Sequence, residues 1–571
     1  MVEDAAARYP VTIDPLAHQA YLKASNTGAG DFFGHSVALS GDTAVIGAPY
    51  EDSAATGVNG NQASNATADA GAAYVFVRDG GVWTFQAYLK ASNTDTGDYF
   101  GYSVALDGNT AVIGARYEDS AATGVNGDQT SNAAAFSGAA YVFVRSGSTW
   151  SQQAYLKASN TGEYDSFGVS VALDGNTAVI GAPAEDSAAI GVNGDQTSNA
   201  APGAGSAYVF VRSGSTWSQQ AYLKATNTGE DDAFGHSVAV SGSQIAVGAP
   251  LEDSEATGVG GDQTSNAALY SGAVYLFSRN LFTGSWSQRY LKASNTGRSD
   301  YFGSSLALSG LTLLVGAPGE SSAATGVNGN QNGNTAIASG AAYVFTLGSG
   351  VLGQWRQQAY LKASNTGASD GFGSSVALDG NTAVIGASSE DSAATGMNGN
   401  QADNSSTESG AAYVFTRVGT SWGQQAYLKG SNTPLEQTFG EFFGRVVAFS
   451  GDTVLAGAFG DNSAATGING NQSDTSARQS GAAHVFTGFA PPPFRITGLL
   501  SVRNPNNSLT VTLSGTGQGT TSHTLQSSPG MAPGTWLGVG TTMSDAEGNF
   551  TFGPFVEPAS RTRYFYRVGV D

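Results

Sequence analysis

The sequence predicts an all-β protein folded as a seven-bladed β-propeller, and three observations lead to this prediction. A Phe-Gly pair recurs at intervals of 67 to 71 residues, beginning at Phe33, Phe100, Phe167, Phe234, Phe302, Phe372 and Phe443. A Gly-Ala pair follows each one at a nearly fixed distance, beginning at Gly47, Gly114, Gly181, Gly248, Gly316, Gly386 and Gly457. No segment shows a helical period, whereas β-branched and aromatic runs between Gly, Asn and Asp residues indicate hairpins. Four-stranded units repeated seven times are typical of a β-propeller.

Each repeat is expected to contain four antiparallel strands, as the first repeat illustrates. Residues 36–39 and 43–48 form two apolar strands around a tight turn, and a long polar loop follows to about residue 71. A third strand over 72–78 and a fourth over 83–91 flank a second turn. In such a blade both short hairpins lie on one face of the propeller. The long loop and the segment leading to Phe-Gly are therefore expected on the other face.

The two ends of the repeat region predict how the ring closes. A Tyr-Leu-Lys motif begins at Tyr21, Tyr88, Tyr155, Tyr222, Tyr290, Tyr360 and Tyr427. The first copy precedes the first Phe-Gly pair, whereas the last repeat ends after Phe486 without a fourth strand. We therefore predict that the strand around Tyr21 pairs with residues 482–486. This N-terminal strand would complete the last blade and remove a free sheet edge.

Four segments are predicted along the chain. A lead-in over 1–18 precedes the propeller over 19–488, and a proline-rich linker over 489–493 follows it. Residues 494–571 are expected to form a small C-terminal β-sandwich-like domain, since apolar and polar residues alternate over 509–513. This last segment is similar to the fibronectin-III-like modules of secreted bacterial proteins. The first residues lack the pattern of a signal peptide, so we expect a removed leader or a fragment of a longer chain.

Composition excludes several classes of function. The formal net charge is −21, from 24 Lys and Arg against 45 Asp and Glu, which argues against a nucleic-acid partner. The chain has no cysteine, so it holds no disulfide, thiol nucleophile or thiolate metal site. No stretch approaches 18 apolar residues, and membrane insertion is not expected.

The pattern Phe33-Gly34 followed by Gly47-Ala48-Pro49 resembles the FG-GAP repeat of integrin α-subunit propellers and of many bacterial extracellular proteins. The resemblance covers roughly residues 19–488. Integrin repeats commonly carry an Asp-rich calcium loop between these two motifs. Here the connection is only residues 40–43, which is too short, so the family's calcium sites do not transfer to this chain. The resemblance implies an extracellular or cell-surface scaffold for binding or adhesion.

The long loops carry acidic residues that suggest a different calcium site in each blade. Calcium takes six to eight oxygen ligands, and carboxylates and Asn side chains in Gly-rich loops provide them. The candidate ligands are Glu51, Asp52, Asn59, Asn61, Glu118, Asp119, Asn126, Asp128, Glu185, Asp186, Asn193, Asp195, Glu252, Asp253, Asp262, Glu390, Asp391, Asn398 and Asn400. The spacing does not match an EF-hand loop. In the alternative interpretation these side chains make Asx turns and accept backbone N–H bonds.

Two further repeated charges have a functional and a structural interpretation. A carboxylate stands two residues before each repeat Phe, at Asp31, Asp98, Asp165, Asp232, Asp300, Asp370 and Glu441. It is either another calcium ligand or a turn residue. The seven lysines all lie in Tyr-Leu-Lys, at Lys23, Lys90, Lys157, Lys224, Lys292, Lys362 and Lys429. They form either a cationic ring or, as we expect, pairs with nearby carboxylates that also protect the outer strands from edge association.

Catalytic signals are poor, and we predict that the protein is not an enzyme. The five histidines lack metal-ligand spacing, and no serine lies in a nucleophile-elbow pattern. Three hypotheses remain: adhesion to a protein or glycan ligand on the long-loop face, self-association in a surface layer or fibre, and a non-catalytic domain of a larger secreted enzyme. An exposed aromatic cluster or a deep pocket on the long-loop face would favour the first.

Overall fold

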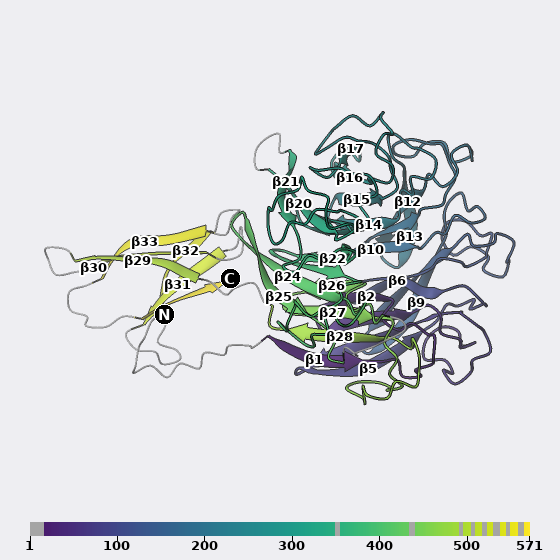
Figure 1. Ribbon diagram of the computed structural model, residues 1–571, viewed down its shortest axis with the longest axis horizontal. Coiled ribbons are helices and arrows are strands. Elements are labelled where there is room, and N and C mark those ends of the chain that lie inside the picture. The colour runs from purple at the N-terminus through teal and green to yellow at the C-terminus, as the bar shows by residue number, and fades with distance from the viewer. Residues whose placement is uncertain are drawn as a thin grey trace.

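The computed structural model describes residues 16–348, 354–432 and 440–489, together with the backbone of six strands between residues 495 and 570 (Figure 1). Every regular element in this part of the chain is a β-strand. The described residues include no helix long and apolar enough to span a membrane. Residues 1–15 of the predicted lead-in (1–18) and residues 490–493 of the predicted linker (489–493) lie outside the described residues.

Seven four-stranded antiparallel sheets form the propeller, as predicted. Six blades are continuous in sequence: β2–β5 (Ser36–Ser40, Thr43–Ala48, Ala72–Asp79, Val82–Leu89), β6–β9 (Phe100–Asp107, Thr110–Ala115, Ala139–Ser146, Thr149–Leu156), β10–β13 (Ser170–Asp174, Thr177–Ala182, Ser206–Ser213, Thr216–Leu223), β14–β17 (Ser237–Ser241, Gln244–Ala249, Ala273–Arg279, Trp286–Leu291), β18–β21 (Ser305–Ser309, Thr312–Ala317, Ala341–Leu347, Trp355–Leu361) and β22–β25 (Phe372–Asp379, Thr382–Ala387, Ala411–Val418, Ser421–Leu428). We number these blades 1 to 6 in chain order.

Blade 7 closes the ring with both ends of the repeat region. It contains β26 (Val447–Ser450), β27 (Thr453–Ala458) and β28 (Ala482–Thr487), and β1 (Ala17–Leu22) is its outer strand. β1 pairs antiparallel with β28, with Tyr21 opposite His484. The predicted closure is therefore confirmed.

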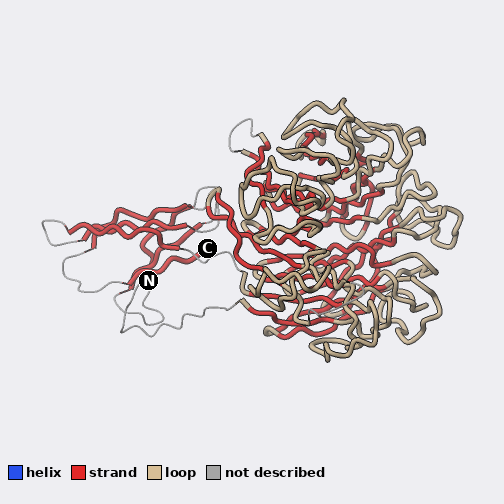
Figure 2. The backbone as a smooth tube through the Cα atoms, in the orientation of Figure 1, coloured by secondary structure: helices blue, strands red, loops and turns tan. Residues whose placement is uncertain are grey.

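The long loop between the second and third strands of each blade folds back onto the outer strand. In blade 1, Val58 forms an isolated bridge with Leu89, and the Lys90 N–H donates to the Gly57 carbonyl oxygen at 2.8 Å. Equivalent bridges occur in all seven blades. The loops therefore cover the outer strand edges, and Figure 2 shows loops distributed around the strands of the propeller. We call the end of the propeller with these loops and the connections leading to Phe-Gly the long-loop face.

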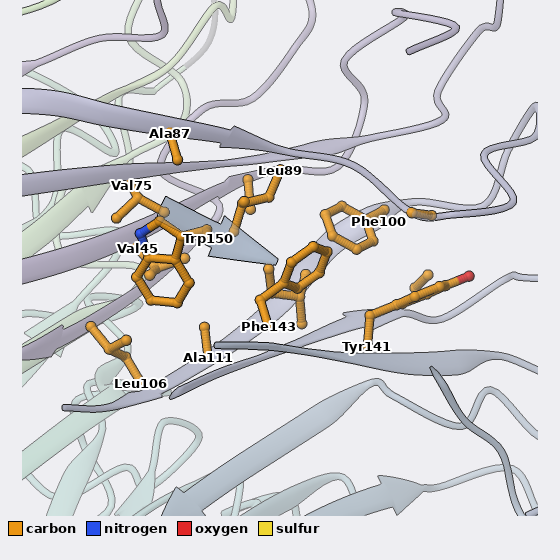
Figure 3. Packing of buried hydrophobic residues seen from close by; sticks show 14 of the residues in the cluster. Val45, Val75, Ala87, Leu89, Phe100, Leu106, Ala111, Tyr141, Phe143 and Trp150 are labelled. Carbon is orange, nitrogen blue, oxygen red and sulfur yellow. The ribbon is translucent and has the colours of Figure 1, made fainter. Parts of the chain in front are cut away.

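The hydrophobic core is divided among the seven blade interfaces. Figure 3 shows the cluster between blades 1 and 2, where Val45 and Leu89 of one blade meet Phe100 and Phe143 of the next. Each repeat Phe is fully buried in such a cluster, and burying one Phe side chain stabilises a protein by roughly 1.5–3 kcal/mol. Since each cluster needs two blades, no blade is expected to be stable alone.

Both glycines of the repeated motifs allow the backbones of adjacent blades to touch. Gly101 has a φ of +88°, and a Cβ on it would overlap the carbonyl oxygen of Ala72 in the preceding blade. A Cβ on Gly47 would overlap the carbonyl oxygen of Gly101. The Ser36 hydroxyl donates to that same oxygen at 2.7 Å. The Phe-Gly and Gly-Ala motifs are therefore two halves of one contact between blades.

Six strands are described beyond residue 494. β29 (Arg495–Arg503), β30 (Leu509–Thr516) and β33 (Asn549–Glu557) form one three-stranded antiparallel sheet. β31 (Ser522–Ser528), β32 (Leu537–Met543) and β34 (Phe565–Val570) form another. The β-sandwich-like domain predicted for residues 494–571 stays a prediction.

Candidate functional site

All seven lysines are buried in ion pairs with the long loop of their own blade. Lys157 Nζ lies 2.9 Å from Glu118 Oε2, and both side chains are at most 1% exposed. The other pairs are Lys23–Asp461, Lys90–Glu51, Lys224–Glu185, Lys292–Glu252, Lys362–Glu320 and Lys429–Glu390. The expected pairing is confirmed, but the expected role at an exposed edge is wrong, because the folded-back loop covers the lysine.

Each loop carboxylate also joins two blades. In blade 2, Glu118 Oε1 accepts hydrogen bonds from Tyr155 Oη and from Asn93 Nδ2, both at 2.8 Å. The same Asn93 accepts from Tyr141 Oη at 2.6 Å through its Oδ1. Since Asn93 lies in the connection from blade 1 to blade 2, this network fixes one blade against the next. Burial lowers the Lys157 pKa, and the Glu118 charge opposes that shift.

The other residues predicted as calcium ligands make local hydrogen bonds in the long loops. Asp52 Oδ1 accepts from the Asp69 N–H, Asn59 Oδ1 from the Tyr88 N–H, and Asn61 Oδ1 from the Ala63 N–H. The same bonds recur for Asp119, Asp186, Asp253 and Asp391, for Asn126, Asn193 and Asn398, and for Asp128, Asp195, Asp262 and Asn400. These are the bonds that the alternative interpretation expects.

The structure does not bring the predicted calcium ligands of a blade to one point. Glu51 is buried against Lys90, while Asp52, Asn59 and Asn61 bond to three separate stretches of backbone. Among the described residues, no group of three or more His, Cys, Asp or Glu side chains is arranged to hold a metal ion. Calcium binding at these loops stays a prediction, which metal analysis of the purified protein tests directly.

In six repeats the carboxylate before the Phe-Gly pair is a buried turn residue that accepts the backbone N–H three residues earlier; in blade 7, Glu441 is buried and its Oε2 has no hydrogen-bond partner among the described residues. Asp98 Oδ2 accepts the backbone N–H of Asp95 at 2.8 Å, and Asp98 is 2% exposed. Burial raises the Asp98 pKa to about 8; the bond from Asp95 opposes the shift, and the Glu118 charge adds to it. The corresponding pKa values rise to about 7 for Asp31, Asp165, Asp232, Asp300 and Asp370.

We predict that Asp98→Asn stabilises the propeller in alkaline solution. The folded pKa of about 8 exceeds the unfolded value of about 4, so the stability contributed by this group is full below about pH 4 and is lost as the pH rises through 8. Asn carries no charge and keeps an acceptor for the Asp95 N–H. The variant should gain on the order of 5 kcal/mol at pH 9, from about four pKa units at about 1.4 kcal/mol each, and almost nothing at pH 4.

Urea unfolding of both proteins across this pH range measures the difference. The matched control is Asp128→Asn in the same blade, because Asp128 is exposed and its pKa is lowered by bonds from Thr130. The control should show no alkaline gain. An equal gain in both variants would contradict the prediction.

The seven repeats differ at a position that lines the central channel. The residue after each Phe-Gly pair lines a cavity of about 590 Å³ formed by the innermost strands of all seven blades. These residues are His35, Tyr102, Val169, His236, Ser304, Ser374 and Arg445. The next residue is Ser in six repeats, and its hydroxyl bonds to the neighbouring blade. The side chain at the variable position takes no part in this repeated bond between blades.

A continuous row of aromatic rings crosses blades 7, 1, 2 and 3 on the long-loop face. Ring centroids of successive members lie 4.7 to 5.6 Å apart, in the order Phe442, Phe459, Phe32, Tyr50, Tyr99, Tyr117, Phe136 and Tyr164. We call this row the aromatic arc. Phe136 and Tyr164 are 39% and 60% exposed, and the other members are half-buried.

The aromatic arc begins at the channel. Phe442, Phe459, Phe32 and Tyr50 line a second hollow of about 280 Å³. His35, Ser388 and Arg445 line both this hollow and the channel cavity. A ligand in the hollow would therefore contact aromatic rings and the polar residues of the channel together.

Several rings of the arc occupy backbone positions that disfavour large side chains. Phe32, Tyr99 and Phe442 have φ values of +53° to +55°, in the left-handed region. The equivalent residues in blades 3, 4 and 6 are Ser166, Ala233 and Gly371. The fold therefore accepts small residues here, and bulky residues with positive φ are uncommon.

An arginine lies between the aromatic arc and the channel, packed on one tyrosine of each. Its guanidinium carbon lies 4.2 Å from the ring centroids of both Tyr102 and Tyr117, and its Nη2 donates to Tyr117 Oη at 2.8 Å. This residue, Arg116, takes the place of the proline that follows Gly-Ala in four other repeats, and Phe459 takes the same place in blade 7.

Sequence reasoning missed both the channel residues and the arc. The residues shared by all repeats predict the fold, whereas the channel and arc residues are those that differ from one repeat to the next. Comparing the copies for positions that differ, such as the residue after Phe-Gly or after Gly-Ala, would have marked Arg445, Arg116 and Phe459. Their convergence in space would still have required the ring geometry.

A closed ring of blades with one unsymmetrical hollow at its axis is compatible with a binding or scaffold role. The chain matches the sequence profile of the FG-GAP repeat over residues 17–76, 83–143, 150–210, 217–277, 286–345 and 355–415. These segments make up more than half of the chain, and the protein belongs to the FG-GAP repeat family. Each segment runs from the outer strand of one blade to the third strand of the next. No curated protein matches the chain.

Proposed function

We propose that this protein is a non-catalytic binding scaffold, extracellular or at the cell surface, that adheres to glycans through the aromatic arc. The arc is the single observation that carries the proposal. Seven structurally equivalent blades present it on only four, so it is not a by-product of the repeat. A contiguous apolar patch at a protein surface marks a recognition site.

The shape and chemistry of the arc favour a glycan chain as ligand. The C–H face of a sugar ring is apolar and packs flat against an aromatic ring, while its hydroxyls bond to polar groups at the rim. The arc offers both, since Tyr50, Tyr99 and Tyr117 combine a ring with a hydroxyl. Its members form a row of successive rings, which fits an extended oligosaccharide better than a compact small molecule.

We predict that Tyr99→Ala weakens glycan binding about tenfold, because one aromatic platform is removed from the middle of the arc. Alanine already occupies the equivalent backbone position in blade 4, at Ala233 with a φ of +56°, so the fold should be kept. A glycan array identifies ligands of the wild-type protein, and isothermal titration calorimetry then measures affinity for the strongest of them.

The matched control is Tyr301→Ala. Tyr301 has the same repeat position and a φ of +56°, but it lies in blade 5, outside the arc. Its loss should leave affinity unchanged. The proposal fails if no glycan binds, or if the Tyr99 and Tyr301 variants bind as tightly as the wild-type protein.

A further inference from the structure

The channel cavity has the character of an anion site in a strongly acidic protein. The chain carries 45 Asp and Glu residues, yet none of them is among the described residues that line the cavity. The lining includes Arg445 and the imidazoles of His35 and His236. Hydroxyls of Tyr102, Ser304 and Ser374 complete its polar surface.

Arg445 is available to a ligand. Its side chain is exposed within the channel, and its guanidinium forms no ion pair or hydrogen bond with the part of the chain that the structure describes. By contrast, two arginines on the third strands of blades 2 and 3 are engaged: Arg145 Nε donates to Asn109 and Arg212 Nε to Asn176. Arg445 is therefore an unpaired arginine that faces a partly enclosed cavity. The carboxylate of a ligand could form the ion pair that the protein itself does not provide.

The charge of Arg445 affects the pKa values of both histidines that line the cavity. Burial, together with the charges of Arg445 and Arg116, lowers the pKa of His35 to about 4, and the bond to the Tyr102 carbonyl opposes this shift. Burial also lowers the pKa of His236, again with a contribution from Arg445. Both imidazoles are therefore neutral at pH 7. The single N–H of neutral His35 lies on Nδ1, which donates to the Tyr102 carbonyl oxygen at 3.2 Å, so the positive charge of the site comes from the arginine.

We infer that the channel mouth binds the carboxylate of an acidic sugar residue, with Arg445 as its principal partner. This inference rests on the proposed function, because the aromatic arc supplies the contacts for the neighbouring sugars. Arg445 lines both the channel and the hollow from which the arc starts. A glycan whose acidic residue sits at Arg445 can therefore extend over Phe32 and Tyr50 toward Tyr164. The ligand class expected at this site is therefore an oligosaccharide that contains a uronic acid.

A planar carboxylate suits this site better than other anions. The arginine fork donates two parallel N–H bonds to two oxygens of one carboxylate. Only one arginine lines the cavity among the described residues, so one negative charge is matched rather than a densely sulfated chain.

The experiment compares three groups on a glycan array: uronic-acid, sulfated and neutral oligosaccharides. The strongest uronic-acid ligand is then chemically reduced, so that each carboxylate becomes a CH₂OH group on the same sugar backbone. We expect the reduced form to bind roughly 10- to 100-fold more weakly, as the loss of a charge-assisted hydrogen bond predicts. Arg445→Gln should bind both forms alike, at the affinity of wild-type protein for the reduced form.

The matched control is Arg298→Gln, which removes the same charge from an exposed arginine of blade 5 outside the channel. It should keep the full difference between the two ligands, which separates a local bond from long-range attraction. A circular dichroism melt checks that both variants fold.

The outcomes separate the inference from the function on which it rests. Preference for sulfated or neutral glycans, or an unchanged ligand ratio in Arg445→Gln, overturns the carboxylate site while Tyr99→Ala still tests the arc. Absence of binding to all three groups overturns both.

Discussion

Replacing Gly181 with alanine is expected to destabilise the propeller by about 3 kcal/mol, the upper end of the usual cost of overpacking. A Cβ at this position would overlap the carbonyl oxygen of Gly235 in the next blade, and Ser170 Oγ lies against it as well. The obstacle is backbone held by a cross-blade hydrogen bond, from Ser170 Oγ to Gly235 O at 2.8 Å, so a rotamer change cannot relieve it. Blades 3 and 4 must separate to accept the methyl group.

The free energy of urea unfolding measures this loss, and Gly423→Ala is the control. Gly423 lies on the outer strand of blade 6, with nothing within 4 Å of the position of an added Cβ. That variant should be as stable as the wild-type protein or slightly more so, because alanine restricts the unfolded chain. Equal stability of the two variants would show that the blades do not approach as closely as described.

Glu118→Gln is expected to cost about 3–5 kcal/mol, the typical result of removing one partner of a buried ion pair. The substitution leaves Lys157 fully buried without a compensating charge. It also places an amide where Tyr155 and Asn93 both donate to a carboxylate oxygen. The loss should shrink as the pH approaches 10, because the pKa of Lys157, already lowered by burial, falls further and the lysine then loses its proton.

Two comparisons make this prediction specific. The double variant Glu118→Gln/Lys157→Met removes both charges and should recover part of the stability, since an isolated buried charge is the main cost. Asp42→Asn weakens a salt bridge of the same kind to Arg78, in which the Asp42 side chain is 65% exposed, and should change stability very little. If Asp42→Asn lowered the free energy of unfolding as much as Glu118→Gln does, burial of the ion pair would not be the cause of the loss.

The repeat made most of the fold predictable. Hairpins, the boundaries of strands such as Thr43–Ala48 and the count of seven blades follow from local patterns that any one copy displays and the others repeat. Closure by the strand around Tyr21 was also predictable. The last blade lacks an outer strand and the N-terminal end has one strand to spare, so these two pair with each other.

The environment of the loop charges was harder to predict. Glu51 and Lys90 were each recognised as repeated, but a sequence shows neither that the loop folds back over the outer strand nor that both side chains become fully buried. A carboxylate in a polar Gly-rich loop is equally typical of a calcium ligand and of a turn residue. Only the partners that surround it in space distinguish these two, and those partners are 25 to 39 residues away in the chain.

The sequence alone therefore determined the propeller. Its local periodicity, its Phe-Gly and Gly-Ala pairs and the unequal ends of the repeat region were sufficient to predict the fold. The candidate site was not predictable in this way, because it consists of departures from the repeat that are separated by hundreds of residues. Arg445 and His35 lie at opposite ends of the propeller sequence and become neighbours only when β1 closes blade 7 against blade 1. Ring closure brings together residues that are far apart in the sequence. The hollow, the aromatic arc and the position of Arg445 where the arc meets the channel therefore exist only in the folded molecule.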